Sequence, residues 1–300
     1  MAIATARVSA FEEPPVRTVR RGAALWAVIR RKPLGLTSAA VLVLFVLTAV
    51  FADVLAPYDP LATQPEIRLS PPSQSHLFGT DDIGRDVLSR VVHGSRISLW
   101  VGLLAVGIGT GAGMIIGLLC GYCEGRLDLL VQRLMDAIQA IPGLILALAI
   151  VSVLKPSTTN AMLAIAIVII PGNSRIVRGA VLSAKQNRYV EAAQAIGCRH
   201  PRIITSHILP NVTAPILIIA SIWFGNAILI EATLSFLGLG TQPPTPSWGL
   251  MLSSTGRAFM EQAPWLAIFP GLAISLAVLG FNLFGDTLRD AWDPKLRRQG

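Results

Sequence analysis

Six stretches of the chain contain no Asp, Glu, Lys or Arg, and each is about as long as a helix that spans a membrane. They are residues 34–52, 97–123, 137–154, 156–174, 212–230 and 262–285. A helix needs about 20 apolar residues to cross about 30 Å of hydrocarbon. The stretches are apolar on all sides and lack the alternation typical of a membrane β-barrel. The sequence therefore predicts an all-α integral membrane protein with six transmembrane helices.

Composition agrees with this class. The chain has 300 residues, of which 53% are hydrophobic and 14% are charged, with a mean hydropathy of +0.61. Soluble domains carry about 25% charged residues. Residues 1–33 precede the first stretch, which is too long for the core of a signal peptide and lacks a small-residue cleavage site after it. The stretch is therefore interpreted as the first transmembrane helix.

The placement of positive charge predicts the orientation of the chain. If the N-terminus is cytoplasmic, 19 of the 25 Lys and Arg residues lie on the cytoplasmic side and 6 on the outer side. This excess predicts that both termini are cytoplasmic. Residues 1–33 then form a basic cytoplasmic tail whose Arg30, Arg31 and Lys32 meet anionic membrane lipid, with Pro33 opening the first helix, and residues 34–300 form the membrane domain. The net charge of +8 is explained by this asymmetry, so nucleic acid is not expected as a partner.

Small residues recur at every fourth position of the second stretch: Ala105, Gly109, Gly113, Gly117 and Gly121. Such a ridge lets a neighbouring helix approach closely in lipid. The glycines do not form a nucleotide-binding loop, because no Lys in the chain follows a Gly. If ATP drives this protein, another chain must bind it.

Two groups of residues resemble metal ligands only superficially. Cys120 and Cys123 form a C-x-x-C pair without a second pair or a nearby His, which favours small apolar residues at a helix end. Asp81, Asp82 and Asp86 lack the spacing of a calcium loop. We expect no metal site.

Prolines and polar groups at membrane depth indicate where the bundle bends or functions. Pro142 follows Asp136, Pro171 is expected to close the fourth helix before Asn173, and Pro270 is expected to break the sixth helix. Asp136 and Asn173 are therefore candidates for a pathway or gate.

Glu231 is the acidic residue closest to a helix interior, and a charge there costs about 2.5 to 3.5 kcal/mol. Glu231 either lines a pathway or accepts hydrogen bonds from neighbouring helices.

Between the fourth and fifth stretches, residues 186–210 are polar and contain two prolines. Tyr189, Ala193 and Ile196 share one face of a short amphipathic helix that Gly197 ends. Pro201 is expected to open a second short helix through Ile203, Ile204 and Ile208, and Pro210 to end it. This pattern predicts a cytoplasmic helix-turn-helix elbow, and a pair of helices lying on the lipid surface remains the alternative.

The elbow carries a recognisable motif. Glu191, Ala192 and Ala193, then Gly197, then Leu209 and Pro210 resemble the motif of permease subunits of ATP-binding cassette importers, with His207 at a position where the general pattern has Ile. Residues 78–103, 174–193, 231–249 and 281–294 resemble the second permease subunit of dipeptide and oligopeptide importers. Residues 121–128 depart from the expected form at Cys123 and Glu124.

This resemblance implies a type I importer permease fold in a bacterial inner membrane and an assembly of several chains. The partners would be a homologous second permease, two ATPase domains on one chain or two, and an external peptide-binding protein. The chain itself would hold no cofactor, since ATP and magnesium would bind to the ATPase domains. The elbow would be a coupling helix seated in a groove of an ATPase domain.

With this orientation, residues 57–96 form the longest outer segment. This outer segment would contact the binding protein or gate the outer mouth through Asp81, Asp82, Arg85 and Asp86.

Two other classes of function have sequence requirements of their own. An intramembrane enzyme would need a catalytic set at membrane depth, but the four His residues lie outside the uncharged stretches and no H-E-x-x-H motif occurs. A channel or carrier that works without an ATPase would transport as a single chain. The resemblance leaves the solute open among dipeptides, longer peptides, nickel chelates and other small solutes.

Overall fold

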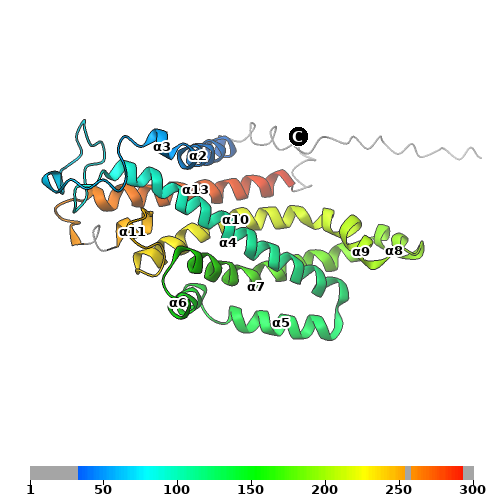
Figure 1. Ribbon diagram of the computed structural model, residues 1–300. Helices are drawn as coiled ribbons and strands as arrows, with labels where there is room; N and C mark the ends of the chain where they lie inside the picture. The colour runs from blue at the N-terminus through cyan, green and yellow to red at the C-terminus, as the bar shows by residue number, and fades with distance from the viewer. Residues whose placement is uncertain (1–32, 254–257, 293–300) are drawn as a thin grey trace, which may run out of the picture.

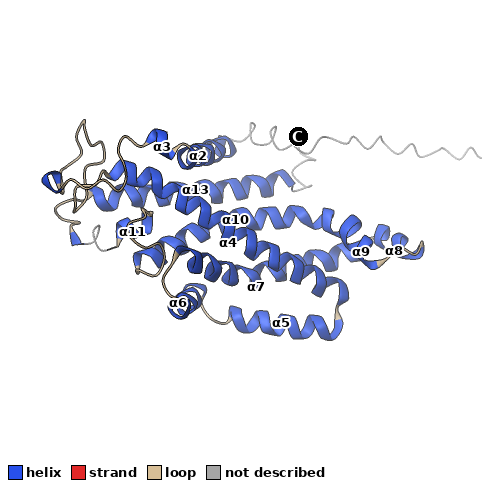
Figure 2. Ribbon diagram, viewed as in Figure 1, coloured by secondary structure: helices blue, strands red, loops and turns tan. Residues whose placement is uncertain are grey.

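The computed structural model describes residues 33–253 and 258–292, and these residues form helices and connecting loops without a β-strand (Figure 2). The all-α prediction is confirmed. The larger helices are α2 (Pro33–Val50), α4 (Val87–Cys123), α5 (Gly125–Gln139), α6 (Gly143–Leu154), α7 (Thr158–Lys185), α10 (Leu209–Phe236) and α13 (Trp265–Trp292). The smaller elements are α3 (Ala52–Leu55), η1 (Pro65–Ile67), α8 (Arg188–Ala195), α9 (His200–Arg202), η2 (Ile203–Ile208) and α11 (Trp248–Leu252).

Each predicted transmembrane stretch is largely helical. Four helices of the described chain are long and apolar enough to cross a membrane, namely α4, α7, α13 and the continuous helix that ends with α10. The pair α5 and α6 makes a fifth span if it is counted as one, and α2 is a shorter apolar helix. The basic tail predicted at residues 1–33 lies, except for Pro33, outside the described residues.

The third predicted helix, residues 137–154, is not a single straight helix. Residues 137–139 end α5, the chain turns at residues 140–142, and α6 leaves at 88° to α5 (Figure 1). Pro142 precedes α6 in an extended conformation, with φ of −52° and ψ of 128°. Proline has no N–H to donate and its ring crowds the preceding helical turn, which favours a break at this position.

The predictions for Pro171 and Pro270 are wrong. Pro171 lies inside α7, which continues to Lys185, and Pro270 lies inside α13. A proline removes only one hydrogen bond from a helix, and packing in a membrane bundle tolerates that loss. Close to this proline, Ser174 Oγ donates to the Pro171 carbonyl at 2.9 Å.

The fourth helical element, α4, starts ten residues earlier than the predicted stretch. Asp86 caps its first turn, with its Oδ2 accepting from Ser89 N at 2.8 Å, so residues 87–96, which precede the uncharged stretch, are also helical. Arg96 in this part binds Asp53 through two hydrogen bonds of 2.8 Å. Hydrogen bonding by Arg96 holds the pKa of the Asp53 carboxyl below its ordinary value. Paired charges let this helix extend beyond the apolar region.

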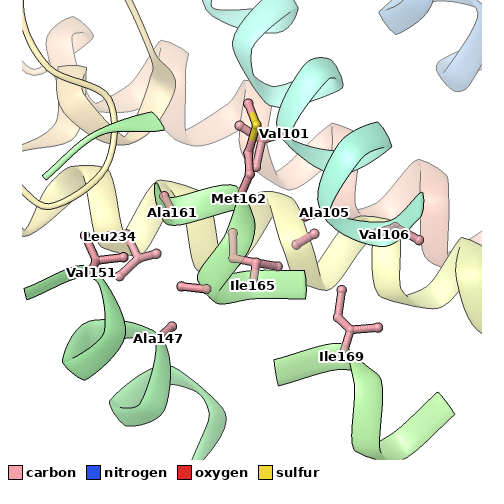
Figure 3. Close-up of a cluster of buried hydrophobic side chains, with 12 residues drawn as sticks. Val101, Ala105, Val106, Ala147, Val151, Ala161, Met162, Ile165, Ile169 and Leu234 are labelled. Carbon is pink, nitrogen blue, oxygen red and sulfur yellow. The ribbon is translucent and has the colours of Figure 1, made fainter. Parts of the chain in front are cut away.

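Close packing of α4 on α7 confirms the prediction drawn from the small-residue ridge. A Cβ placed on Gly117 would lie 2.5 Å from the Ser174 carbonyl oxygen, and one on Gly113 would lie 2.7 Å from Asn173 Cβ. Side chains from α4, α6, α7 and α10 form the neighbouring apolar core (Figure 3). The labelled members include Val101, Ala105, Val151, Ile165 and Leu234.

The two ends of the bundle differ. In Figure 1, α8 and α9 project from one end, while α11 and the long connection between α3 and α4 lie at the other. Trp248 of α11 donates through Nε1 to the Val91 carbonyl of α4 at 2.9 Å, which ties that second end together. The elbow and the outer segment are therefore separated by the length of the spanning helices.

Candidate functional site

The first half of the elbow is the amphipathic helix α8, as predicted. Val190 and Ala193 are its buried residues, and they pack in a cluster with Ile203 and Ile208. Ala193 belongs to the predicted apolar face, but the other two members of that face do not join the core. Tyr189 is 40% exposed and Ile196 is 80% exposed. Two large apolar side chains thus remain free on the outer surface of the elbow.

Gly197 ends α8 as predicted, with φ of +78°. The Gly197 N–H donates to the Gln194 carbonyl at 2.9 Å, and the Cys198 N–H donates to the Ala193 carbonyl at 3.0 Å. This pair of bonds is the Schellman motif, in which the residue after the cap adopts a left-handed conformation. The elbow bends at a turn whose backbone hydrogen bonds are satisfied, so its shape is well defined.

The second half of the elbow differs from the prediction that Pro210 ends a separate short helix. A continuous helix runs from His200 to Phe236 through α9, η2 and α10. The wide π-helical turns of η2, residues 203–208, come directly before Leu209 and Pro210. In these turns each carbonyl accepts from the N–H five residues later instead of four. The backbone hydrogen bonds can therefore shift by one residue just before Pro210, which has no N–H, and the helix continues. The elbow is therefore joined rigidly to α10.

A contact with α4 anchors the elbow to the bundle. Tyr122 Oη lies 2.6 Å from His200 Nδ1, and Lys185 Nζ donates to the Tyr122 carbonyl at 2.9 Å and to Glu124 Oε1 at 2.7 Å. These bonds connect the last turns of α4 and α7 with the start of α9. Nothing in the sequence pairs Tyr122 with His200, 78 positions away, so sequence reasoning missed this contact.

The motif residues divide into two groups. Ala193 is buried and Leu209 is half-buried, so both help to shape the elbow. Glu191, Ala192, Gly197 and Pro210 are exposed. Glu191, Ala192, Ile196 and Gly197 lie on α8 or the turn that ends it and give the elbow a small, partly apolar exposed surface. Such a surface can seat in a groove of another protein.

A ladder of ion pairs holds α5 against α7. Asp128 binds Arg178 through two bonds of 2.6 Å, and Asp136 binds Arg175. The sequence indicated Asp136 as a pathway or gate residue but gave no signal for the Asp128–Arg178 pair, which is 50 positions apart.

Asn173 is fully buried, and its Nδ2 donates to Thr110 Oγ1 at 2.9 Å, so in the described chain it links α7 to α4.

Glu231 is fully buried in α10. Its Oε1 accepts from Ser235 Oγ at 2.6 Å and from Thr241 Oγ1 at 3.2 Å, while Oε2 has no hydrogen-bond partner in the described ranges. The Ser235 hydroxyl also accepts from Thr241 N at 2.8 Å. These contacts tie the loop after α10 to the helix. Glu231 has no exposed surface in the described chain, and its hydrogen bonds come from its own helix and the following loop rather than from neighbouring helices.

The outer acidic residues are held mostly by internal contacts. Asp81 accepts from Arg85 N and Nε at 2.9 and 2.6 Å, and Asp86 caps α4 while its Oδ1 lies 2.9 Å from His76 Nδ1. Asp81 and Asp86 are buried, whereas Asp82 and Arg85 are partly exposed. Of the four predicted contact residues, Asp82 and Arg85 offer the accessible charge.

No group of three His, Cys, Asp or Glu side chains in the described residues is arranged to hold a metal ion. Cys120 is buried in the last turn of α4 and Cys123 is exposed.

The chain is similar to known transport proteins over nearly its whole length. Residues 113–298 match the family described as binding-protein-dependent transport system inner membrane component, and residues 22–72 match the N-terminal TM domain of oligopeptide transport permease C. The dipeptide transport system permease protein DppC of Alkalihalophilus pseudofirmus is 47% identical over 272 residues, covering 90% of this chain and 88% of that protein. The probable D,D-dipeptide transport system permease protein DdpC of Escherichia coli is 45% identical over 282 residues, covering 94% of each.

Two further comparisons agree. The di/tripeptide transport system permease protein DppC of Pseudomonas aeruginosa is 46% identical over 262 residues, covering 85% of this chain and 86% of that protein. A chain of the MetNI methionine ABC transporter, solved in inward-facing conformations, has a similar fold with a TM-score of 0.58 at 17% identity, covering 69% of this chain and 98% of that chain.

Proposed function

The chain belongs to the family of inner membrane components of binding-protein-dependent transport systems, and from this premise we propose that it conducts short peptides into the cell. It is a multi-pass permease of an ATP-binding cassette importer in a bacterial inner membrane. Peptides are the proposed cargo because the similar proteins are named for dipeptides, D,D-dipeptides and di- or tripeptides.

The proposed assembly contains a homologous second permease, two ATPase domains and an external peptide-binding protein. The ATPase domains would bind ATP and magnesium. The sequence supports placing ATP binding on other chains. No Lys follows a Gly in this chain, so it has no phosphate-binding loop of the G-x-x-x-x-G-K-[ST] type.

The observation that best supports the proposal is the rigid elbow at one end of the bundle. Its first helix follows α7 after only two residues, and its second half is continuous with α10. A push on the exposed Ile196 and Glu191 surface would therefore move two spanning helices together. Shifting a two-state gate from 1:99 to 99:1 takes about 5.5 kcal/mol of differential interaction. A rigid elbow can pass this free energy on to the helices joined to it, whereas a flexible loop would change its own conformation instead.

At the opposite end, the outer segment is the proposed place for the binding protein. Asp82 and Arg85 present accessible charge there, on a loop that Asp81 and Asp86 hold in shape. Charged surface groups steer a partner and set its register more than they add affinity. The binding protein would deliver peptide between this segment and the second permease.

Reconstitution in liposomes tests the proposal. We expect ATP-driven dipeptide uptake from the complete set of chains and no uptake from this chain alone. Flux through the single chain would favour a self-sufficient channel or carrier instead. Uptake of a nickel chelate in preference to dipeptides, with the same set of chains, would replace the proposed cargo.

A further inference from the structure

A charged groove of about 580 Å³ lies between α5 and α7. Both signs of charge line it, together with one amide and one apolar side chain. The side chains concerned are those of Asp128, Asp136, Arg133, Arg175, Arg178, Gln132 and Leu129.

The two ion pairs that join α5 to α7 in the groove are not equivalent. Arg178 donates two hydrogen bonds of 2.6 Å to Asp128, and the Arg178 and Asp128 side chains are 32% and 11% exposed, respectively. Arg175 reaches Asp136 with one nitrogen, and these side chains are 55% and 44% exposed. The first pair fastens α5 to α7. The second pair presents both of its charges to the groove.

Gln132 adds a polar group without a partner. Its Nε2 is buried and makes no hydrogen bond within the described residues. A buried amide donor without a partner is costly, so a ligand or water that accepts from it would be favoured.

The open pair is not expected to face lipid. Arg175 directly follows the uncharged stretch 156–174, and Asn173, two residues before it, bonds Thr110 of the uncharged stretch 97–123. The pair therefore lies where the apolar part of α7 ends. Exposed charges beside apolar helices face water or another protein rather than acyl chains.

We propose that this groove is a binding site on the translocation pathway for the charged ends of a zwitterionic peptide. The peptide carboxylate would bind Arg175, with Arg133 close by, and the peptide ammonium would bind Asp136. Gln132 Nε2 would donate to a peptide carbonyl. The inference rests on the proposed function, which supplies the peptide.

The net charge of the groove does not change when a zwitterionic peptide binds, so the peptide can both bind and dissociate. A zwitterion that inserts between Arg175 and Asp136 replaces one ion pair with two and changes no net charge. An extended dipeptide spans about 7 Å, so its two ends can reach two neighbouring side chains. When the peptide leaves, the original pair closes again, and neither charge is left unpaired.

The test uses the complete importer in liposomes, with variants Arg175→Gln and Asp136→Asn and the double neutral variant. Arg126 is an exposed residue of α5 outside the groove, so Arg126→Gln is the matched control. Binding of a radiolabelled dipeptide to the nucleotide-free importer, without the binding protein, is compared with binding of its C-amidated and N-acetylated forms. Size-exclusion chromatography checks assembly of each variant.

We expect the wild type and the control to prefer the free dipeptide over either blocked form by about tenfold, as for loss of one hydrogen bond to a charged group. Arg175→Gln should abolish the preference for a free carboxylate only, and Asp136→Asn the preference for a free ammonium only. The double variant should lose both while remaining assembled.

If all assembled variants kept the wild-type preference for the free dipeptide, the inference would be overturned. The proposed function would still stand in that case, provided that the wild type took up peptide. Binding that follows the phosphatidylglycerol content of the liposomes, and not the peptide termini, would assign the groove to a lipid phosphate. A wild-type importer that takes up no peptide would overturn the proposed function, and the inference with it.

Discussion

Tyr122 at the end of α4 and His200 at the start of α9 are joined by a hydrogen bond of 2.6 Å between Oη and Nδ1. The bond connects the elbow to a helix that is not adjacent to it in the chain. Since α4 also packs closely on α7, the elbow is held by both of the helices that pack along the glycine ridge.

Tyr122→Phe removes this bond without removing the ring. A typical hydrogen bond contributes about 0.5 to 1.5 kcal/mol, so we expect peptide transported per ATP hydrolysed to fall by a few fold. The complete importer should still assemble, because the apolar cluster around Val190 and Ile203 is unchanged. An unaltered ratio of transport to hydrolysis would show that this contact does not stiffen the elbow.

Gly197→Val tests the bend of the elbow. A β-branched residue at φ of +78° costs about 1 to 2 kcal/mol or more, so the Schellman turn should distort and uncouple ATP hydrolysis from uptake. Gly111→Ala is the control, because Gly111 lies in α4 with open space around it. ATPase activity and peptide uptake are measured together. Coupled transport in the Gly197 variant would contradict the assigned role of the bend.

Ile196→Ser tests the exposed apolar surface of the elbow. Burial of an Ile side chain contributes about 1.5 to 3 kcal/mol, so the affinity for the ATPase chains should fall by at least tenfold. Val54→Ser is a matched control, since Val54 is 82% exposed at the opposite end of the bundle and Ile196 is 80% exposed. Co-purification and a binding titration in detergent report the result. Equal affinities for both variants would exclude Ile196 as an anchor.

Gly117→Ala tests the packing of α4 on α7. The added methyl would lie 2.5 Å from the Ser174 carbonyl oxygen, and we expect the helices to separate at a cost of about 1 to 3 kcal/mol. Gly107→Ala, on an open face of the same helix, should be neutral or slightly stabilising. Thermal unfolding in detergent compares the two. Equal unfolding temperatures would mean that the contact yields without cost.

Much of the candidate site could be predicted from the sequence because its determinants are local. Gly197 ends a helix through its own backbone freedom, and Ala193 is buried because it follows the helical period. The burial of Val190 in place of Tyr189 and Ile196 could not be predicted, since it depends on where Ile203 and Ile208 lie after the turn. The same limit explains the prolines. Pro142, Pro171 and Pro210 all lack an N–H and all crowd the preceding turn, so the residue type alone does not tell which of them ends a helix. The packing around each proline decides that.

The sequence by itself determined that this chain is a bundle of membrane helices, because only uncharged stretches of sufficient length can cross hydrocarbon. It also determined the glycine ridge of α4 and the bend at Gly197, which depend on residue type and spacing. The tertiary structure decided which polar side chains meet. Asp136 faces Arg175, Asp128 faces Arg178 and Tyr122 faces His200 because α4, α5, α7 and α9 converge in space. Such pairs depend on distances between segments that are far apart along the chain, and no local pattern in the sequence encodes them.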